Sequence, residues 1–172
     1  MLKLFGALLI FAAGTLAGFY QSSRYMNRPV QIRHLVLALE RLQTEISYGG
    51  TPLPEALARS GRGIPQPVGA LFAEASRRMN EPGSSSAMEI WQDAVAETWK
   101  RTAMREPERE ILMSVGATLG ASGRDDQLKH LRLAVRQLQS EEETARDEQM
   151  RYGKMWRSLG IMAGALVVIL MY

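Results

Sequence analysis

The chain has 172 residues, of which 46% are hydrophobic, so it can form one domain of ordinary size with a buried core. It contains no cysteine, which excludes a disulfide framework, a thiolate metal site and a cysteine nucleophile. The formal net charge is only +3, so the composition does not predict a clustered basic face for nucleic-acid binding.

An apolar segment opens the sequence. Residues 4–20 carry no charged side chain, and a helix of that length is about 25 Å long, close to the thickness of a hydrocarbon core. Lys3 and Tyr20 would then lie in the two membrane interfaces. We predict a transmembrane helix over residues 1–21. The alternative is a secretory signal peptide that is cleaved after Ala17.

Helical periodicity dominates residues 22–153, and strand patterns are nearly absent. About six segments show it, several with one apolar face, which predicts a compact all-α bundle. The predicted buried positions, in chain order, are Leu35, Leu39, Leu42, Ile46, Leu53, Leu57, Val68, Leu71, Phe72, Ala75, Met79, Met88, Trp91, Val95, Trp99, Ile111, Leu112, Val115, Leu119, Leu128, Leu131, Val135 and Leu138.

Several helix starts have their own signals. Thr51 is a candidate N-cap, with Pro52 at the first helical position, where a missing N–H costs nothing. Ser86 and Glu89 have the spacing of a capping box. Pro107 opens a later helix, and the acids that follow it favour the positive end of the helix dipole.

The segment LGASGRDDQ, from Leu119, interrupts the periodicity. Gly120 is predicted to end a helix in the left-handed conformation. Ser122, with Asp125, is predicted to cap the next helix. This last helix has no later proline, and it carries three consecutive acids, Glu141–Glu143, which we interpret as a solvated face.

A second apolar run, Met155–Tyr172, closes the sequence and is interrupted only by Arg157. We predict a transmembrane helix over residues 154–172 that continues the last bundle helix. Basic residues flank both runs on the side of the middle segment, and the positive-inside rule therefore places residues 22–153 in the cytoplasm. These residues are Arg24, Arg28, Arg33, Arg146, Arg151, Lys154 and Arg157, against Lys3 on the far side.

Each apolar run contains a pair of glycines four positions apart. The pairs are Gly14 with Gly18 and Gly160 with Gly164. Such pairs let two membrane helices approach closely, so they predict packing between the two spans or against partner helices. Glycine is also common in membrane helices in general, and both interpretations remain open.

Catalytic motifs are missing from the sequence. His34 and His130 are far apart and have polar or basic neighbours, which is typical of surface residues. There is no phosphate-binding loop, H-E-x-x-H motif or nucleophile elbow. Asp125 and Asp126 suit a helix start better than a paired-acid site. We therefore predict no enzyme activity, no catalytic or metal site, no cofactor and no small-molecule substrate.

Four segments in order carry a resemblance to a known family. They are LQTEISYG (42–49), TPLPEAL (51–57), LGASGRDDQLKHL (119–131) and KMWRSLGIMAGALVVILMY (154–172). Together with the length and the terminal apolar runs, they resemble the stage III sporulation protein AB family. That family resembles the cytoplasmic F domain of the type II secretion platform protein, a six-helix bundle. The residues that match its motifs are Thr51, Pro52, Leu53, Leu119, Gly120, Ser122 and Gln127, whereas Gly123 replaces the family's usual acid.

The resemblance implies a function in endospore formation. It implies a multi-pass protein of the mother-cell membrane that faces the forespore and belongs to a channel complex between the two cells. Its cytoplasmic domain would act as a platform that binds a secretion-type ATPase, other channel subunits and membrane lipid, and a homo-oligomer is left open. The alternatives are half of a general type II secretion or type IV pilus platform, or an unrelated membrane adaptor.

Overall fold

A computed structural model describes the backbone of residues 26–48, 50–83, 85–120 and 123–171, and the side chains of these residues up to Tyr152 and at Met162. The described residues form six helices and no strand, which confirms the all-α prediction. The helices are one over residues 26–48, α2 (Leu53–Gly61), α3 (Val68–Met79), α4 (Ala87–Trp99), α5 (Glu106–Thr118) and α6 (Arg124–Met171).

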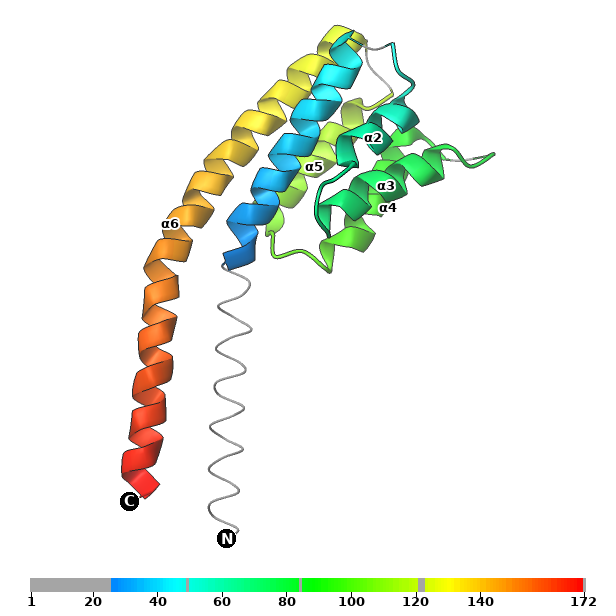
Figure 1. Cartoon of the computed structure of the whole chain (residues 1–172). Coiled ribbons are helices and arrows are strands. Elements are labelled where there is room, and N and C mark those ends of the chain that lie inside the picture. The colour runs from blue at the N-terminus through cyan, green and yellow to red at the C-terminus, as the bar shows by residue number, and fades with distance from the viewer. Residues whose placement is uncertain (1–25, 49, 84, 121–122, 172) are drawn as a thin grey trace. The chain divides into compact units, whose positions relative to one another are not determined.

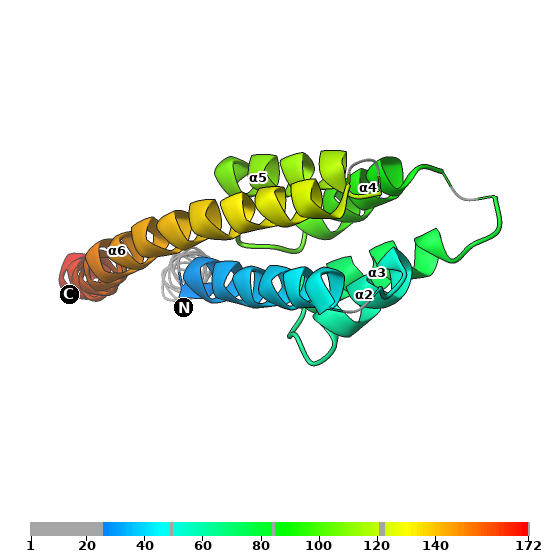
Figure 2. The ribbon, with the colours of Figure 1, turned by 90° about the horizontal axis from the view of Figure 1, so that it is seen from above.

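Contacts divide the chain into two compact units. One unit is Arg28–Glu143, called the helical domain below, and the other combines Met1–Asn27 with Thr144–Tyr172. Within the helical domain, α4, α5 and the first part of α6 form one layer, and helix 26–48, α2 and α3 form the other (Figures 1 and 2). Consecutive short helices pack on one another, α2 on α3, α3 on α4 and α4 on α5.

The core lies between these layers. The predicted face of helix 26–48 is confirmed for Leu35, Leu39 and Leu42, which are fully buried, whereas Ile46, in the last turn, is half-buried. Across the core, the rings of Phe72 and Trp91 meet edge to face, with centroids 5.6 Å apart. The burial of one such large apolar side chain stabilises a fold by about 1.5–3 kcal/mol. The core therefore gives the helical domain an apolar interior of its own.

The indole of Trp91 links α4 to α5. Its Nε1–H donates a 2.7 Å hydrogen bond to the carbonyl oxygen of Leu112, so the buried polar group is satisfied. The ring also lies directly against Gly116, where an added Cβ would be 2.4 Å from the indole Cδ1. Gly116 is therefore needed for this close packing of the two helices.

The predicted buried face of α4 needs a correction. Trp91 and Val95 are fully buried, but Met88 is 40% exposed and Trp99 is only half-buried. Met88 lies in the first turn of the helix and Trp99 is its last residue, so the stripe extends beyond the packed part at both ends. The core-facing side of α4 instead adds neighbours of Trp91 and Val95, which are Ile90, Ala94 and Thr98.

The two predicted caps have different outcomes. The capping box is confirmed, because Glu89 N–H donates to Ser86 Oγ at 3.3 Å and Ser86 N–H donates to the Glu89 carboxylate at 3.2 Å. The prediction that Thr51 caps α2 is wrong, since Pro52 occupies the N-cap position. With Thr51 as N-cap, Pro54 would be the third helical residue and would offer no N–H to the threonine hydroxyl.

None of the helices in the described part of the chain combines the length and the apolar character that a membrane span requires. The predicted span over residues 1–21, with Gly14 and Gly18, lies outside the described residues. The span over residues 154–172 belongs to α6 as far as Met171, but the placement of Gly160 and Gly164 is not described beyond the helical backbone. The flanking membrane helices therefore stay predictions.

Candidate functional site

Two of the segments that carry the family resemblance meet at one place in the helical domain. Gly120 follows α5 with φ of +76°, which confirms its predicted left-handed conformation. A Cβ added there would lie 3.1 Å from Ala87 Cβ and 3.9 Å from Leu53 Cδ2. The end of α5 therefore touches the first residues of α2 and of α4. We call Thr51, Leu53, Ala87, Leu119 and Gly120 the turn cluster.

Two other members of the turn cluster, Leu119 and Thr51, make hydrogen bonds that stabilise the turns on which they lie. Leu119 is 1% exposed, and its N–H donates to the carbonyl oxygen of Gly116 at 3.3 Å. Thr51 Oγ1 donates to Glu45 Oε2 at 3.3 Å, and Arg59 Nη1 donates to the same oxygen at 3.4 Å. These contacts fasten the turn between helix 26–48 and α2, so Thr51 has an architectural role although it does not cap a helix.

The remaining motif residues lie at the start of α6. Gln127 is half-buried, and its backbone N–H donates to the carbonyl oxygen of Gly123 at 3.0 Å. Ser122 lies outside the described residues, so its predicted cap stays a prediction. A Cβ at Gly123 would have no atom within 4 Å. An acid at position 123 would therefore fit, and its absence is compatible with the same backbone.

A buried ion cluster, which the sequence did not reveal, joins three helices. Arg28 Nε and Nη2 donate to Glu108 Oε1 at 2.9 and 2.5 Å, and Nη2 also donates to Glu141 Oε2 at 3.1 Å. The side chains of Arg28 and Glu108 are 4% and 0% exposed. Glu108 Oε2 accepts a further hydrogen bond, of 2.6 Å, from the N–H of Arg105. We call Arg28, Glu108 and Glu141 the ion cluster.

The ion cluster corrects two interpretations of the sequence. Glu108 does lie near the start of α5, as predicted, but it is fully buried and also pairs with a residue 80 positions away. The acids Glu141–Glu143 are not simply a solvated face, because Glu141 bonds Arg28 and Glu142 bonds Arg33 at 2.9 Å. Burial of these charges requires paired partners, so the contacts fix helix 26–48 against α5 and α6.

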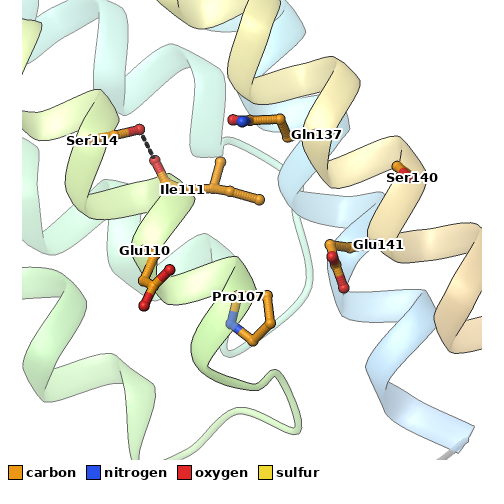
Figure 3. Close-up of a pocket in the computed structure, with 7 residues that line it drawn as sticks. All are labelled: Pro107, Glu110, Ile111, Ser114, Gln137, Ser140 and Glu141. Atoms are coloured by element: carbon orange, nitrogen blue, oxygen red, sulfur yellow. Dashed lines mark hydrogen bonds between the residues drawn. The ribbon is translucent and has the colours of Figure 1, made fainter.

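A groove runs between α5 and α6 within the helical domain. The groove is open to solvent, has a volume of about 410 Å³, and is lined in part by Glu141 of the ion cluster. Figure 3 shows Ile111 of α5 and Gln137 of α6 extending toward one another, with Pro107 nearby. The α5–α6 groove is lined by Pro107, Glu110, Ile111, Ser114, Gln137, Ser140 and Glu141.

His34 and His130 are half-buried on separate helices. In the part of the chain that is described, no group of three or more His, Asp and Glu side chains could hold a metal ion. The chemistry of the turn cluster, the ion cluster and the groove is that of packing, hydrogen bonding and charge pairing, which suits protein–protein recognition.

The comparisons with known proteins agree with the resemblance. A family model described as "Stage III sporulation protein AB" matches residues 3–172. A relative called "Stage III sporulation protein AB", from Bacillus subtilis (strain 168), is 39% identical over 171 residues, which cover 99% of each chain. A solved structure of "Stage III sporulation protein AB" is 38% identical, with a TM-score of 0.68, over 73% of this chain and 98% of that one.

Proposed function

The chain belongs to the stage III sporulation protein AB family, and we propose that it is a membrane-anchored platform subunit of the channel between mother cell and forespore. In this role the helical domain binds a cytoplasmic secretion-type ATPase, and the terminal segments bind other channel subunits in the mother-cell membrane. The observation that carries the proposal is the family match along the whole chain. The chain itself acts by binding and does not turn over a substrate.

The proposed membrane anchoring rests on the sequence of the two ends. Residues 4–20 and 158–172 carry no charged side chain, and basic residues border both runs on the side of the helical domain. Two anchors would hold the helical domain at the membrane surface. Such tethering raises the effective concentration of a weakly bound partner without any new contact. Reporter fusions in the loop over residues 80–86 test the orientation, and activity outside the cytoplasm would contradict it.

The proposed platform role is tested by affinity isolation. We would tag the full-length chain in sporulating cells, solubilise the membranes and identify the recovered proteins. A matched control keeps both apolar ends but replaces residues 28–143 with an unrelated helical bundle. We expect the ATPase with the natural chain only, and channel subunits of the membrane with both chains. Recovery of pilin-type subunits, or of the ATPase with the control, would contradict the proposal.

A further inference from the structure

Helix 26–48 has a second apolar face that points away from the core. Val30, Leu37 and Tyr48 are 44%, 40% and 90% exposed. Leu37 and Tyr48 follow Val30 by 7 and 18 positions. At about 100° per residue, the three residues therefore lie within roughly 20° of one another around the helix. The buried residues Leu35, Leu39 and Leu42 lie on the opposite side. Such apolar alignment on an exposed face is typical of an interaction surface.

Two basic side chains lie on or beside this face. Arg33 follows Val30 by three positions, and its side chain is 58% exposed although it pairs with Glu142. Arg41 follows Leu37 by four positions and donates to the carbonyl oxygen of Arg62 in an exposed bond of 2.8 Å. The exposed contact of Arg41 is worth about 1 kcal/mol or less, so a partner can replace it, and Arg33 contacts Glu142 through Nε. We call Val30, Arg33, Leu37, Arg41 and Tyr48 the outer face.

The α5–α6 groove has the complementary character. Two carboxylates line the groove, that of Glu141, which pairs with Arg28 in the ion cluster, and that of Glu110. Pro107 and Ile111 supply apolar lining. On α6, Leu133 is 52% exposed one turn before Gln137. The groove thus offers negative charge beside apolar surface.

The two surfaces also match in length. From Val30 to Leu37 a helix rises about 10 Å, and from Pro107 to Ser114, along the α5 side of the groove, it rises about the same distance. Two apolar side chains with one arginine between them therefore fit the span of the groove. Recognition of this type, in which one face of a helix lies in a groove, is a common mode of protein association.

We propose that the outer face of one copy docks into the α5–α6 groove of a second copy. Val30 lies over Pro107, Leu37 lies beside Ile111 and Ser114, and Arg33 faces the carboxylate of Glu110. The two surfaces differ, so the contact is heterologous, and each docked copy still offers one free surface for the next. The proposal concerns self-assembly and goes beyond the platform function.

A contact between the outer faces of two copies is less favourable than docking into the groove, because it would bring like charges together. If two copies paired these faces in parallel, Arg33 would meet Arg33 and Arg41 would meet Arg41. Like charges placed directly opposite each other are destabilising and act against such a partner. The heterologous contact instead places arginine against glutamate.

Cross-linking of full-length chains tests this contact, because the natural sequence has no cysteine. We would co-express two differently tagged chains, one with Leu37→Cys and the other with Ser114→Cys, and treat intact cells with a short bismaleimide. We expect a covalent dimer that carries both tags. A control replaces Leu37→Cys with Ala73→Cys, an exposed position of α3, and should give no such dimer. Absence of the mixed dimer, or efficient dimers from Leu37→Cys alone, would overturn the proposal.

A charge exchange tests the predicted partners of the contact. Glu110→Arg in the Ser114→Cys chain should lower the yield of mixed dimer roughly tenfold, because the introduced guanidinium would then face Arg33. Arg33→Glu in the Leu37→Cys chain should restore much of the yield. Equal yields in all combinations would show that the two side chains do not face one another, and the proposed docking would be wrong.

Discussion

The helical domain contains two groups of paired Arg and Glu residues, one buried and one exposed. The ion cluster joins helix 26–48, α5 and α6 through side chains of Arg28 and Glu108 that are almost fully buried. A second group on α3 and α4 consists of Glu74, Arg77, Arg78 and Glu97, and we call it the surface network. There Glu74 accepts bonds of 3.0 Å from Arg77 Nε and 2.5 Å from Arg78 Nε, and Arg78 also bonds Glu97.

The difference between the groups lies in what remains when one partner is lost. In the surface network water replaces the missing partner, and exposed pairs contribute only about 0–1 kcal/mol. In the ion cluster the remaining charge stays buried without compensation, which is costly. The number of ion pairs therefore says little about stability, whereas the burial of Glu108 says much.

Loss of the Glu108 carboxylate should have the largest effect. We expect Glu108→Ala to lower the free energy of unfolding of the purified chain by about 3–5 kcal/mol, because it leaves Arg28 buried without its main partner. The N–H of Arg105 also loses its acceptor. Denaturant titration measures the change. Glu110→Ala, an exposed position on the same helix, is the matched control and should cost less than about 0.5 kcal/mol. Equal effects would contradict the contrast.

A double substitution separates the charge from the architecture. Arg28→Met alone should destabilise the chain strongly, since Glu108 then keeps a buried charge without its cation. Glu108→Gln keeps an acceptor for the N–H of Arg105. The combination Arg28→Met with Glu108→Gln should cost less than the sum of the single effects, by about 0.5–3 kcal/mol in a double-mutant cycle. Additive costs would mean that the two side chains are not coupled.

The turn cluster should be sensitive at Gly120. We expect Gly120→Ala to cost about 1 kcal/mol or more, because a side chain disfavours its left-handed backbone conformation and the new Cβ would crowd Ala87. Gly123→Asp provides the contrast at a nearby position with open space. It should change the free energy of unfolding by less than about 0.5 kcal/mol. Thermal melting of both variants measures the difference, and a neutral Gly120→Ala would contradict the role of the turn.

The surface network should give the smallest effect, visible only in acid. Hydrogen bonds from Arg77 and Arg78 lower the pKa of Glu74 from 4.5 to about 2. A lowered pKa stabilises the fold above pH 4.5, and this contribution is lost as the pH falls toward 2. Glu74→Gln should therefore remove part of the loss of stability in that range, about 0.2–1 kcal/mol. An unchanged acid profile would show that Glu74 is not paired in solution.

Local patterns were sufficient for much of the fold. The capping box at Ser86, the left-handed Gly120 and the inner face of helix 26–48 each depend on residues within a few positions of one another, and all three are confirmed. Thr51 was misplaced because a threonine before two prolines satisfies a cap pattern although Pro54 removes the required N–H. The N-cap pattern applied to Thr51 considers the residue type at the cap, but it does not consider proline at the third helical position.

The ion cluster and the groove could not be predicted in the same way. Arg28 lies 80 positions from Glu108 and 113 from Glu141, so no local spacing relates them. Arg28 also follows an apolar run, where a basic residue suits the membrane flank, and that role hid its structural one. Val30, Leu37 and Tyr48 recur at helical spacing in the sequence, as do the buried Leu35, Leu39 and Leu42 of the same helix. Only the structure shows which side is covered.

The most direct experiment asks whether the helical domain acts through its own surface. Residues 28–143 would be replaced in the full-length chain by an unrelated helical bundle with the same ends, and spore yield would be measured in cells that lack the natural chain. We expect that the replaced chain reaches the membrane, fails to capture the ATPase and gives no more spores than cells without the chain. Full spore yield from the replaced chain would show that the surface of the helical domain is not needed for function.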